Sequence, residues 1–342
     1  MTPPASDLAR LGGQIARRHD SRDRPHVDDP EVRRLIAAIA PGAEATDLGG
    51  MMSLNLWLRP AGMVLRVHRP LLSADRLGAL QRVRDHLAAR GLNVGAPVAW
   101  RGRTLFPCGG RWAEMEPYLP STRPDPTGEA YGEMLRAAGS LHRALATYPG
   151  KVPRPLVATY GPPTTLLRWL PAAETAAAED AAAREILSQV RGAIGLLRRR
   201  WVPETALPRG LIHGDIRLAN VPRAPSGEPV YFDFGFLAHR PRIHELAYAL
   251  AWIVLRPDGR GRAEEFAWEN FPDLLRAYEE GSDVRLTDLE RRALGPYLAA
   301  VPLFLMALAG YVPDPVGHLR SEARLAFLRI GEWVLRHPEA AR

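Results

Sequence analysis

Apolar and polar residues alternate along the segment from residue 45 to residue 67, which predicts β-strands. A glycine-containing turn at residues 47–53 separates the first two strands, and a Pro-Ala-Gly turn leads to a third strand at residues 63–67. Further apolar segments with strand composition follow at residues 94–100, 104–107 and 112–118. The first part of the chain is therefore predicted to contain a small, mainly antiparallel sheet.

Elsewhere the apolar positions recur every three or four residues, which predicts helices. The longest such segments are residues 73–90, residues 127–148 and residues 172–201. These patterns predict an α+β fold with a helical N-terminal extension at residues 1–40, a sheet-bearing lobe at residues 41–118 and a mainly helical lobe at residues 119–342. The extension is expected to pack on the small lobe and to have no chemical role.

Composition favours an intracellular globular protein. The chain has 342 residues, of which 46% are apolar, enough for one large or two modest domains. Its longest apolar stretch, residues 297–312, is broken by Pro302 and Gly310 and is shorter than the roughly 20 residues that span a bilayer. The first 20 residues lack the apolar core of a secretory signal. Because Cys108 is the only cysteine, no internal disulfide forms, and a cytoplasmic location without membrane contact is expected.

The charge pattern does not indicate nucleic-acid binding. The net charge is +7, but Lys151 is the only lysine, and the arginines are spread along the chain among acidic residues. We therefore expect no nucleic acid as a partner. The positive charge also makes the overall field less favourable for a strongly cationic ligand.

Candidate chemistry is concentrated at residues 211–235, which read LIHGDIRLANVPRAPSGEPVYFDFG. Two short apolar runs each lead to an aspartate, Asp215 and Asp233, with Asn220 and a Pro/Ser/Gly turn between them. A chain reversal at this turn would bring the three side chains around one small volume. Two carboxylates and an amide suit a hard divalent cation and a base, which phosphoryl transfer from Mg-ATP requires.

The order H-G-D-x4-N followed by D-F-G resembles the motif of the aminoglycoside phosphotransferase and choline kinase-like family. The resemblance implies a bilobal protein-kinase-like fold, ATP as phosphate donor with GTP not excluded, and Mg²⁺. It also implies that Asp215 is the catalytic base and that Asn220 and Asp233 hold the metal ion. The expected partner is a small molecule with a hydroxyl group, and the expected assembly is a monomer or a homodimer.

Three further residues are assigned supporting roles by their position in this pattern. His213 is expected to orient the loop so that Asp215 keeps its direction, and Glu245 is expected to fix the loop backbone. Arg217 has two open interpretations, a phosphate contact or an arginine paired with an aspartate or exposed at the surface. A zinc site made of His213, His239 and His244 is disfavoured, because carboxylate and amide groups suit magnesium better.

The same resemblance assigns nucleotide-binding roles in the first lobe. Gly49, Gly50 and Ser53 would cover the phosphates. Main-chain groups around Glu116 and Tyr118 would hold the adenine edge.

Arg66 occupies the strand position at which kinases of this fold carry a phosphate-binding lysine. Such kinases pair that lysine with a glutamate of the next helix. On the helix at residues 73–90, Asp75 and Asp85 project away from the apolar stripe, and only Gln81 lies near its edge. The usual pair is therefore predicted to be missing or replaced.

The function predicted from these features is ATP-dependent phosphorylation of a small-molecule hydroxyl, with an antibiotic or another natural product as one candidate. Two alternatives stay open: a metabolic kinase of an amino alcohol, sugar or homoserine-like acceptor, and a catalytically silent nucleotide-binding relative. Acidic residues are frequent between residues 264 and 283. They would either meet an amine-bearing acceptor or form a solvated face, and the solvated face is favoured.

Overall fold

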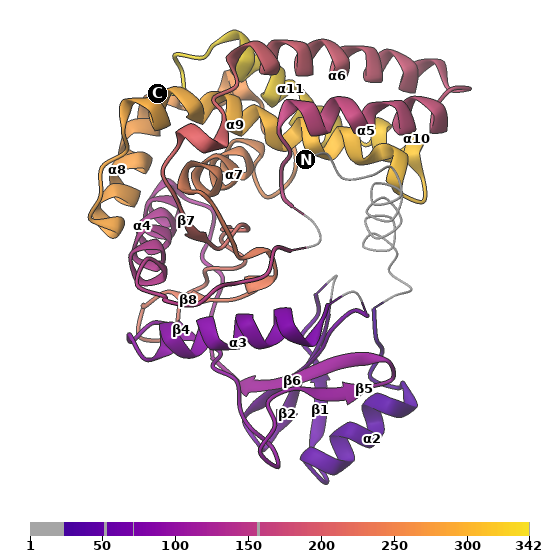
Figure 1. Cartoon of the computed structure of the whole chain (residues 1–342), viewed down its shortest axis with the longest axis vertical. Coiled ribbons are helices and arrows are strands. Elements are labelled where there is room, and N and C mark those ends of the chain that lie inside the picture. Colours follow the sequence, from indigo (N-terminus) through magenta and orange to yellow (C-terminus); the bar gives the residue numbers. More distant parts are fainter. Residues whose placement is uncertain (1–23, 51–52, 71, 156–157, 342) are drawn as a thin grey trace.

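The computed structural model describes residues 24–50, 53–70, 72–155 and 158–341. They form two lobes, a β-rich N-lobe and a mainly helical C-lobe (Figure 1). This is the α+β, kinase-like arrangement that the sequence predicts.

The N-lobe is built on a five-stranded antiparallel sheet with the strand order β1-β2-β3-β6-β5. Its strands are β1 (Glu44–Asp47), β2 (Leu54–Arg59), β3 (Met63–Val67), β5 (Phe106–Cys108) and β6 (Arg111–Pro117). Alternation places Leu54, Leu56 and Leu58 of β2 on one face, where all three are fully buried. Helix α2 (Pro30–Ile39) contributes Val32 to the same core, whereas residues 1–23 of the predicted extension lie outside the described residues.

Helix α3 (Ala74–Ala88) lies between the sheet and the C-lobe (Figure 1). The side chain of Ser73 accepts a hydrogen bond from the backbone N–H of Arg76 and so caps the helix start. Besides its apolar stripe, α3 buries Gln81, which contacts Glu114 of the sheet, and Arg76, which contacts Gly235 of the C-lobe. The helix is thus the layer through which the sheet contacts the C-lobe.

The strand expected at residues 94–100 is much shorter than predicted. Only β4 (Asn93–Val94) forms, and it pairs in parallel with β8 (Val230–Tyr231) of the C-lobe. Gly95 and Pro97 follow directly, and Pro97 has no N–H to extend a strand ladder. The segment therefore joins the two lobes through β4, and it reaches the N-lobe sheet by an isolated antiparallel bridge between Val98 and Met115 of β6.

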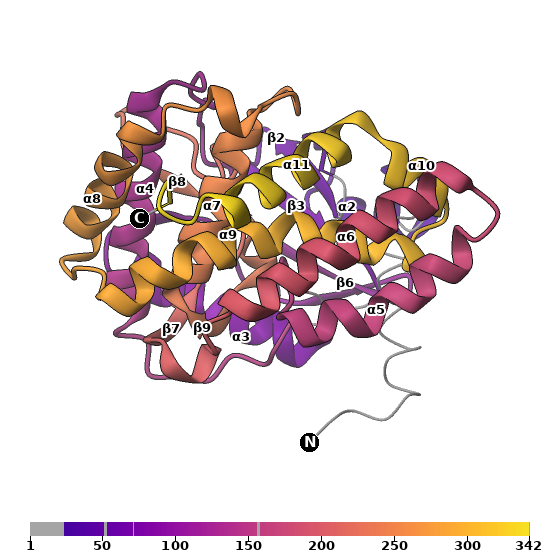
Figure 2. The same cartoon turned by 90° about the horizontal axis from the view of Figure 1, so that it is seen from above.

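The C-lobe contains the remaining helices, and α5, α6, α9 and α11 lie on its side away from the sheet (Figures 1 and 2). Its α-helices are α4 (Gly128–Leu145), α5 (Pro163–Ala176), α6 (Ala181–Arg200), α7 (Arg242–Leu255), α8 (Phe271–Ser282), α9 (Asp288–Ala307), α10 (Pro315–Arg320) and α11 (Glu322–Arg336). Short 3-10 turns occur at η2 (Glu204–Ala206), η3 (Phe234–Phe236), η4 (Ala263–Glu265), η5 (Trp268–Asn270) and η6 (Leu308–Tyr311).

Two features of these helices refine the sequence interpretation. The single helix predicted at residues 172–201 is wrong at its start: α5 ends at Ala176, and Asp180 caps α6 through a 2.8 Å bond from the N–H of Ala183. The apolar segment Asp288–Tyr311, which contains α9, is long enough to cross a membrane, but 89% of its apolar window is buried inside the protein. It is the central core helix of the C-lobe.

Candidate active site

The stretch singled out in the sequence lies between β7 (Arg209–Ile212) and β9 (Ala238–Pro241), which pair antiparallel. The segment after β8 reaches a cavity between the lobes. Ser53 and Arg66 line this cavity from the sheet, Leu80 lines it from α3, and Asp233 and Phe234 line it from the C-lobe. The cavity has apolar walls and charged groups at one end, as expected of a nucleotide site.

His213 ties the loop that carries Asp215 to the segment that carries Asp233. Its Nε2 donates a hydrogen bond to the carbonyl of Phe232 at 2.8 Å, and its Nδ1 accepts from the N–H of Asp215 at 3.3 Å. These bonds fix one tautomer of the ring. They also fix the spacing between the two aspartate-bearing segments.

Asp215 is buried, with 3% of its surface exposed, and several groups hold its carboxylate. The amide of Asn220 donates to the Asp215 carbonyl at 2.7 Å and to its Oδ2 at 3.0 Å. The Arg217 guanidinium approaches Oδ1 at 2.9 Å and donates to Oδ2 at 3.2 Å. Of the two interpretations of Arg217, the pairing with an aspartate is the one observed.

The electrostatic surroundings favour the protonated form of Asp215. Burial is the main cause that raises its pKa above the ordinary value, and the nearby charge of Asp233 adds to it, although Arg217 and a hydrogen bond from Tyr248 act in the opposite direction. A carboxylate with a raised pKa in a cavity is a stronger base than a solvated aspartate. Tyr248 lies on α7, and no feature of the sequence motif indicated it.

Asp233 has a left-handed backbone, with φ 60° and ψ 64°. Such a conformation is uncommon for a residue other than glycine and is concentrated at functional sites. Among the residues that the structure describes, the carboxylate of Asp233 has no ion-pair partner. It accepts one weak hydrogen bond, at 3.4 Å, from the N–H of Gly235. It is therefore available at the cavity.

Asp233 and Asn220 provide the oxygen donors that a hard divalent cation requires. The Asn220 side chain uses its NH₂ group to hold Asp215, so its amide oxygen is the atom left for a metal ion. Among the described residues no group of three or more His, Cys, Asp and Glu side chains is arranged to hold a metal. The histidine-based zinc site therefore finds no support, whereas a carboxylate–amide pair fits Mg²⁺.

Glu245, at the start of α7, binds the backbone of the loop. It is fully buried, and its carboxylate accepts from the N–H of Gly214 at 2.8 Å and from the N–H of Ile216 at 3.2 Å. Burial alone would raise the pKa of Glu245, but the hydrogen bond and charge of His142 outweigh burial and hold that pKa below its usual value. An ionised Glu245 thus fixes the residues on both sides of Asp215.

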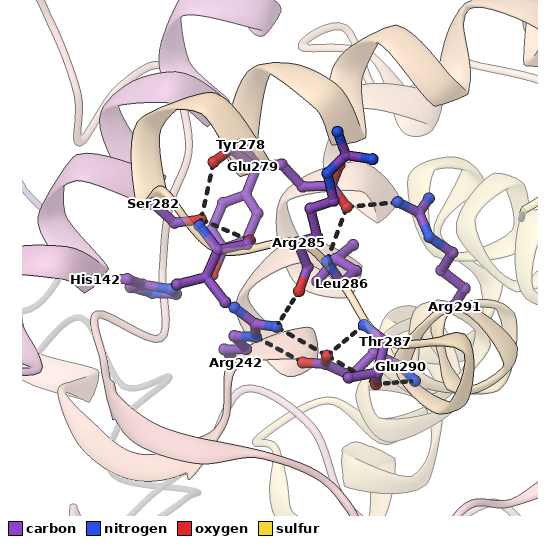
Figure 3. A network of polar contacts seen from close by, with 11 residues as sticks. His142, Arg242, Tyr278, Glu279, Ser282, Arg285, Leu286, Thr287, Glu290 and Arg291 are labelled. Atoms are coloured by element: carbon purple, nitrogen blue, oxygen red, sulfur yellow. Dashed lines mark hydrogen bonds and ion pairs between the residues drawn. The ribbon is translucent and has the colours of Figure 1, made fainter.

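This support extends into the helices of the C-lobe. His142 of α4 lies 3.4 Å from Glu245 through Nε2 and 2.8 Å from the Tyr278 hydroxyl through Nδ1. Figure 3 shows that Arg242 of α7 pairs with Glu290, whose carboxylate also accepts from Thr287 at the start of α9. The loop that carries Asp215 is therefore supported by a network of polar contacts from α4, α7, α8 and α9.

Arg66 points into the interlobe cavity, and its Nη2 lies 3.0 Å from Oε1 of Glu116. No carboxylate of α3 contacts Arg66 among the described residues, as the helical phase predicts. Helix α3 instead contributes Arg84, which pairs with both Glu114 and Glu116. The usual polarity is reversed here, because the helix supplies a cation and β6 supplies both carboxylates.

The second carboxylate of this cluster, Glu114, also contacts His68 at 3.0 Å and accepts from Gln81 at 2.8 Å. Burial alone would raise the pKa of Glu114, but the charge of Arg84 and the hydrogen bond from His68 hold that pKa well below its usual range. Sequence analysis missed Arg84. Two signals were present in the sequence. Glu114 and Glu116 are two residues apart and so share one face of their strand, and Arg84 lies one turn after Gln81 on the helix.

The nucleotide-covering loop is only partly described, because Met51 and Met52 lie outside the described residues. Gly49 and Gly50 have φ angles of 83° and 112°, a conformation that favours glycine. Ser53 lines the interlobe cavity, whereas neither glycine does. A phosphate-covering role for this loop stays a prediction.

The segment assigned to the adenine edge differs from expectation in detail. The Glu116 carboxylate faces the arginines of the cluster, and the N–H of Tyr118 already donates to the carbonyl of Gly62 at 2.9 Å. The Tyr118 ring stacks on Trp57 at a centroid distance of 4.4 Å. The main-chain N–H of Tyr118 is therefore not available to a base, and the side chain of Glu116 positions Arg66.

Arg76 of α3 joins the lobes directly at this site. Its guanidinium donates to the carbonyls of Gly235 and Leu237, both at 2.9 Å, and to the carbonyl of Pro153. Burial, with a smaller effect of Arg240, lowers the pKa of Arg76 to about 10. The contact links α3 to the residues just after Asp233, and it was not foreseen from the sequence.

Comparison with known proteins matches residues 49–282 to the model of the phosphotransferase enzyme family. The chain belongs to this family. The matched region contains the loop with Asp215 and Asn220, the Asp233 segment and the arginine-bearing strand β3. This phosphotransferase is therefore a small-molecule kinase by class.

Individual relatives agree with that class. A homoserine kinase of Xanthobacter autotrophicus is 29% identical over 279 residues, which cover 78% of this chain and 79% of that protein. Among solved structures, a microcompartment-associated aminopropanol kinase aligns with a TM-score of 0.69 at 17% identity, covering 92% of this chain and 98% of that one. An amicoumacin kinase bound to AMP-PNP and Ca²⁺ aligns with a TM-score of 0.68 at 16% identity, covering 91% and 94%. At these identities the solved structures establish the fold.

Proposed function

We propose that this phosphotransferase transfers the γ-phosphoryl group of ATP to a hydroxyl of a small molecule, with Asp215 as the base. The observation that carries the proposal is the buried Asp215 carboxylate, held by Asn220 and by a loop that Glu245 fixes. A binding protein without catalysis would have no need to keep a buried carboxylate oriented in this way.

In the proposed reaction the acceptor hydroxyl lies against Asp215 and gives its proton to this carboxylate. The acceptor oxygen forms a bond to the γ-phosphorus while the bond between that phosphorus and the oxygen of ADP breaks. Positioning matters more than basicity in such a loose transition state, and the bonds from Asn220 and Arg217 supply positioning. The raised pKa of Asp215 assists the proton transfer.

Asn220 and Asp233 would hold Mg²⁺, which neutralises charge on the phosphates when it is bound. Arg66 would contact phosphate oxygens from the opposite side of the cavity. Because Glu116 engages one Nη of Arg66, the guanidinium is oriented before the nucleotide arrives. ATP is the proposed donor, and GTP is an alternative that the same phosphate contacts accept.

For the acceptor, an antibiotic or another natural product is one candidate and a metabolite is the second. The second is favoured by the homoserine kinase relative, which aligns over most of both chains. The aminopropanol kinase and the amicoumacin kinase share the fold. The first represents the metabolite candidate, and the second represents the natural-product candidate.

The test is release of ADP from Mg-ATP in the presence of a panel of hydroxyl acceptors, with the product identified by mass spectrometry. Asp215→Ala is expected to abolish turnover and to retain nucleotide binding. Asp75→Ala, an exposed aspartate of α3, is the matched control and should keep full activity. Undiminished turnover in Asp215→Ala would refute the assignment of the base, and nucleotide binding without turnover on any acceptor would favour the silent relative.

A further inference from the structure

A second cavity is lined by Arg217, the ion-pair partner of Asp215. Its walls come from Arg123 before α4, from α4, from residues 217–219, from α7 and the turn after it, and from the start of α11. Its charged lining among the described residues consists of Arg123, Arg217, Arg256, Arg324 and Asp258. Four arginines face one aspartate, so the cavity is strongly cationic.

Arg217 connects this cavity to the proposed base. One side of its guanidinium lies 2.9 Å from the Asp215 carboxylate, and its other side lies 5.3 Å from the ring centroid of Trp252. Trp252 in turn contacts Phe327 at a centroid distance of 5.1 Å. The cavity therefore joins an aromatic wall to the place where an acceptor hydroxyl must lie.

The other arginines of the cavity differ from Arg217 in having no acidic partner. Within the part of the chain that the structure describes, Arg123, Arg256 and Arg324 form no ion pair. Arg324 is the clearest case, because it is only partly exposed and burial lowers its pKa. A guanidinium taken out of water without a partner is unfavourable, and an anionic ligand would offset that cost.

The acidic stretch between residues 264 and 283 does not line this cavity. Its members are mostly exposed and paired with arginines, as in the pairs Arg262–Glu265 and Arg276–Asp273. Glu265 and Asp273 border a neighbouring surface cleft instead. The favoured interpretation of this stretch, a solvated face, agrees with these contacts, and none of its acidic residues lines the cavity that contains Arg217.

We propose that the acceptor carries an anionic group, a carboxylate or a phosphate ester, which Arg324 binds while the acceptor hydroxyl lies at Asp215. This inference rests on the proposed function, because it names the class of substrate for the same site. Arg123 and Arg256 strengthen the positive field at the cavity mouth, and the aromatic wall covers the carbon skeleton between the two functional groups.

The test uses acceptors that differ only by the anionic group. Homoserine is compared with 3-aminopropanol and threonine with 1-amino-2-propanol, since each amine is the decarboxylated form of its amino acid. Glycerol 1-phosphate compared with glycerol tests a phosphate ester. We expect one anionic member to have the higher kcat/KM, and the pair in which the preference appears identifies the anion. A preference for the uncharged or amine member in all three pairs would overturn the proposal.

Arg324→Gln provides the second measurement, with Arg329→Gln, an exposed arginine on the same helix, as control. Loss of one charge-assisted bond predicts a rise of about 10- to 100-fold in the KM for the anionic acceptor. The KM for ATP should stay unchanged in both variants. An equal KM for the anionic acceptor in Arg324→Gln and Arg329→Gln would contradict the role of Arg324.

Calorimetric titration separates this proposal from the proposed function. The same acceptors are titrated into wild type and Arg324→Gln in the presence of AMP-PNP and Mg²⁺. Anion binding that Arg324→Gln weakens, in a protein that turns over no acceptor, would support the anion site and refute the kinase reaction. Equal binding of anionic and decarboxylated compounds to both proteins would refute the anion site alone.

Discussion

The buried charge cluster that lines the interlobe cavity leads to a specific stability prediction. The side chains of Glu114 and Glu116 are each 5% exposed, and Arg84 contacts both carboxylates. Arg84→Met would leave Arg66 as the only arginine paired with these two carboxylates among the described residues, with His68 as a hydrogen-bond partner of Glu114. Removing one partner from a buried ion pair costs about 3–5 kcal/mol, and we expect unfolding free energy to fall by that amount at neutral pH.

The loss should depend on pH in a defined direction. In the wild type the pKa of Glu114 lies well below the ordinary glutamate value of 4.5, so its contribution to stability is present above that value and is lost as the pH falls through the folded pKa. In Arg84→Met burial is no longer opposed by the arginine, and the folded pKa of Glu114 should rise above its unfolded value. The folded variant then binds a proton more readily than the unfolded chain, and its stability increases as the pH falls. The difference between the two proteins should therefore be largest at pH 7 and smaller at pH 5.

Urea denaturation followed by tryptophan fluorescence at both pH values measures this difference. Arg82→Met, an exposed arginine on α3, is the control and should change stability by less than about 0.5 kcal/mol. The double variant Arg84→Met/Glu114→Gln should recover part of the loss at pH 7, because it removes the uncompensated charge. A loss below about 1 kcal/mol, or a loss that is equal at the two pH values, would refute the reasoning.

Three further changes test the surroundings of the site. Gly95→Ala would place a Cβ 2.7 Å from the carboxyl carbon of Glu116; we expect a loss of about 1–3 kcal/mol in thermal unfolding and a higher KM for ATP. Glu245→Gln replaces an acceptor of two loop N–H groups by a group that is partly a donor; kcat should fall by about 10- to 100-fold with little change in ATP affinity. Arg217→Met removes a cation that lowers the pKa of Asp215; the acidic limb of the pH profile of kcat/KM should move to higher pH.

The loop with the proposed base was predictable because its candidate residues are local in sequence. His213, Asp215 and Asn220 lie within one short loop, and the spacing to Asp233 fixes a single chain reversal. The alternating pattern of β2 and the apolar run of β3 likewise predicted their strands, and the resemblance to the kinase pattern indicated that Arg66 faces the cavity. Such features follow from neighbouring residues and need no knowledge of tertiary contacts.

Features that depend on contacts between distant segments were missed. The partner of Arg66 comes from β6 and not from the adjacent helix, and sequence spacing does not reveal strand order. Tyr248 reaches Asp215 from α7, and Arg76 reaches Gly235 across the two lobes. The end of α5 was also misplaced, because alanines on both sides of residues 177–180 hide the break that Asp180 caps.

The reversed polarity of the cluster changes what orients Arg66, the cation proposed to bind phosphate. In protein kinases that cation depends on a glutamate of the mobile helix that follows its strand. Here Arg66 and Glu116 belong to neighbouring strands, and their register is diagonal, since Arg66 lies opposite Glu114 and Glu116 lies opposite Val64. Arg84 of α3 then binds the far side of the same carboxylates. A displacement of α3 would remove Arg84 but leave the Arg66–Glu116 contact in place, so the sheet alone suffices to orient Arg66 toward the cavity.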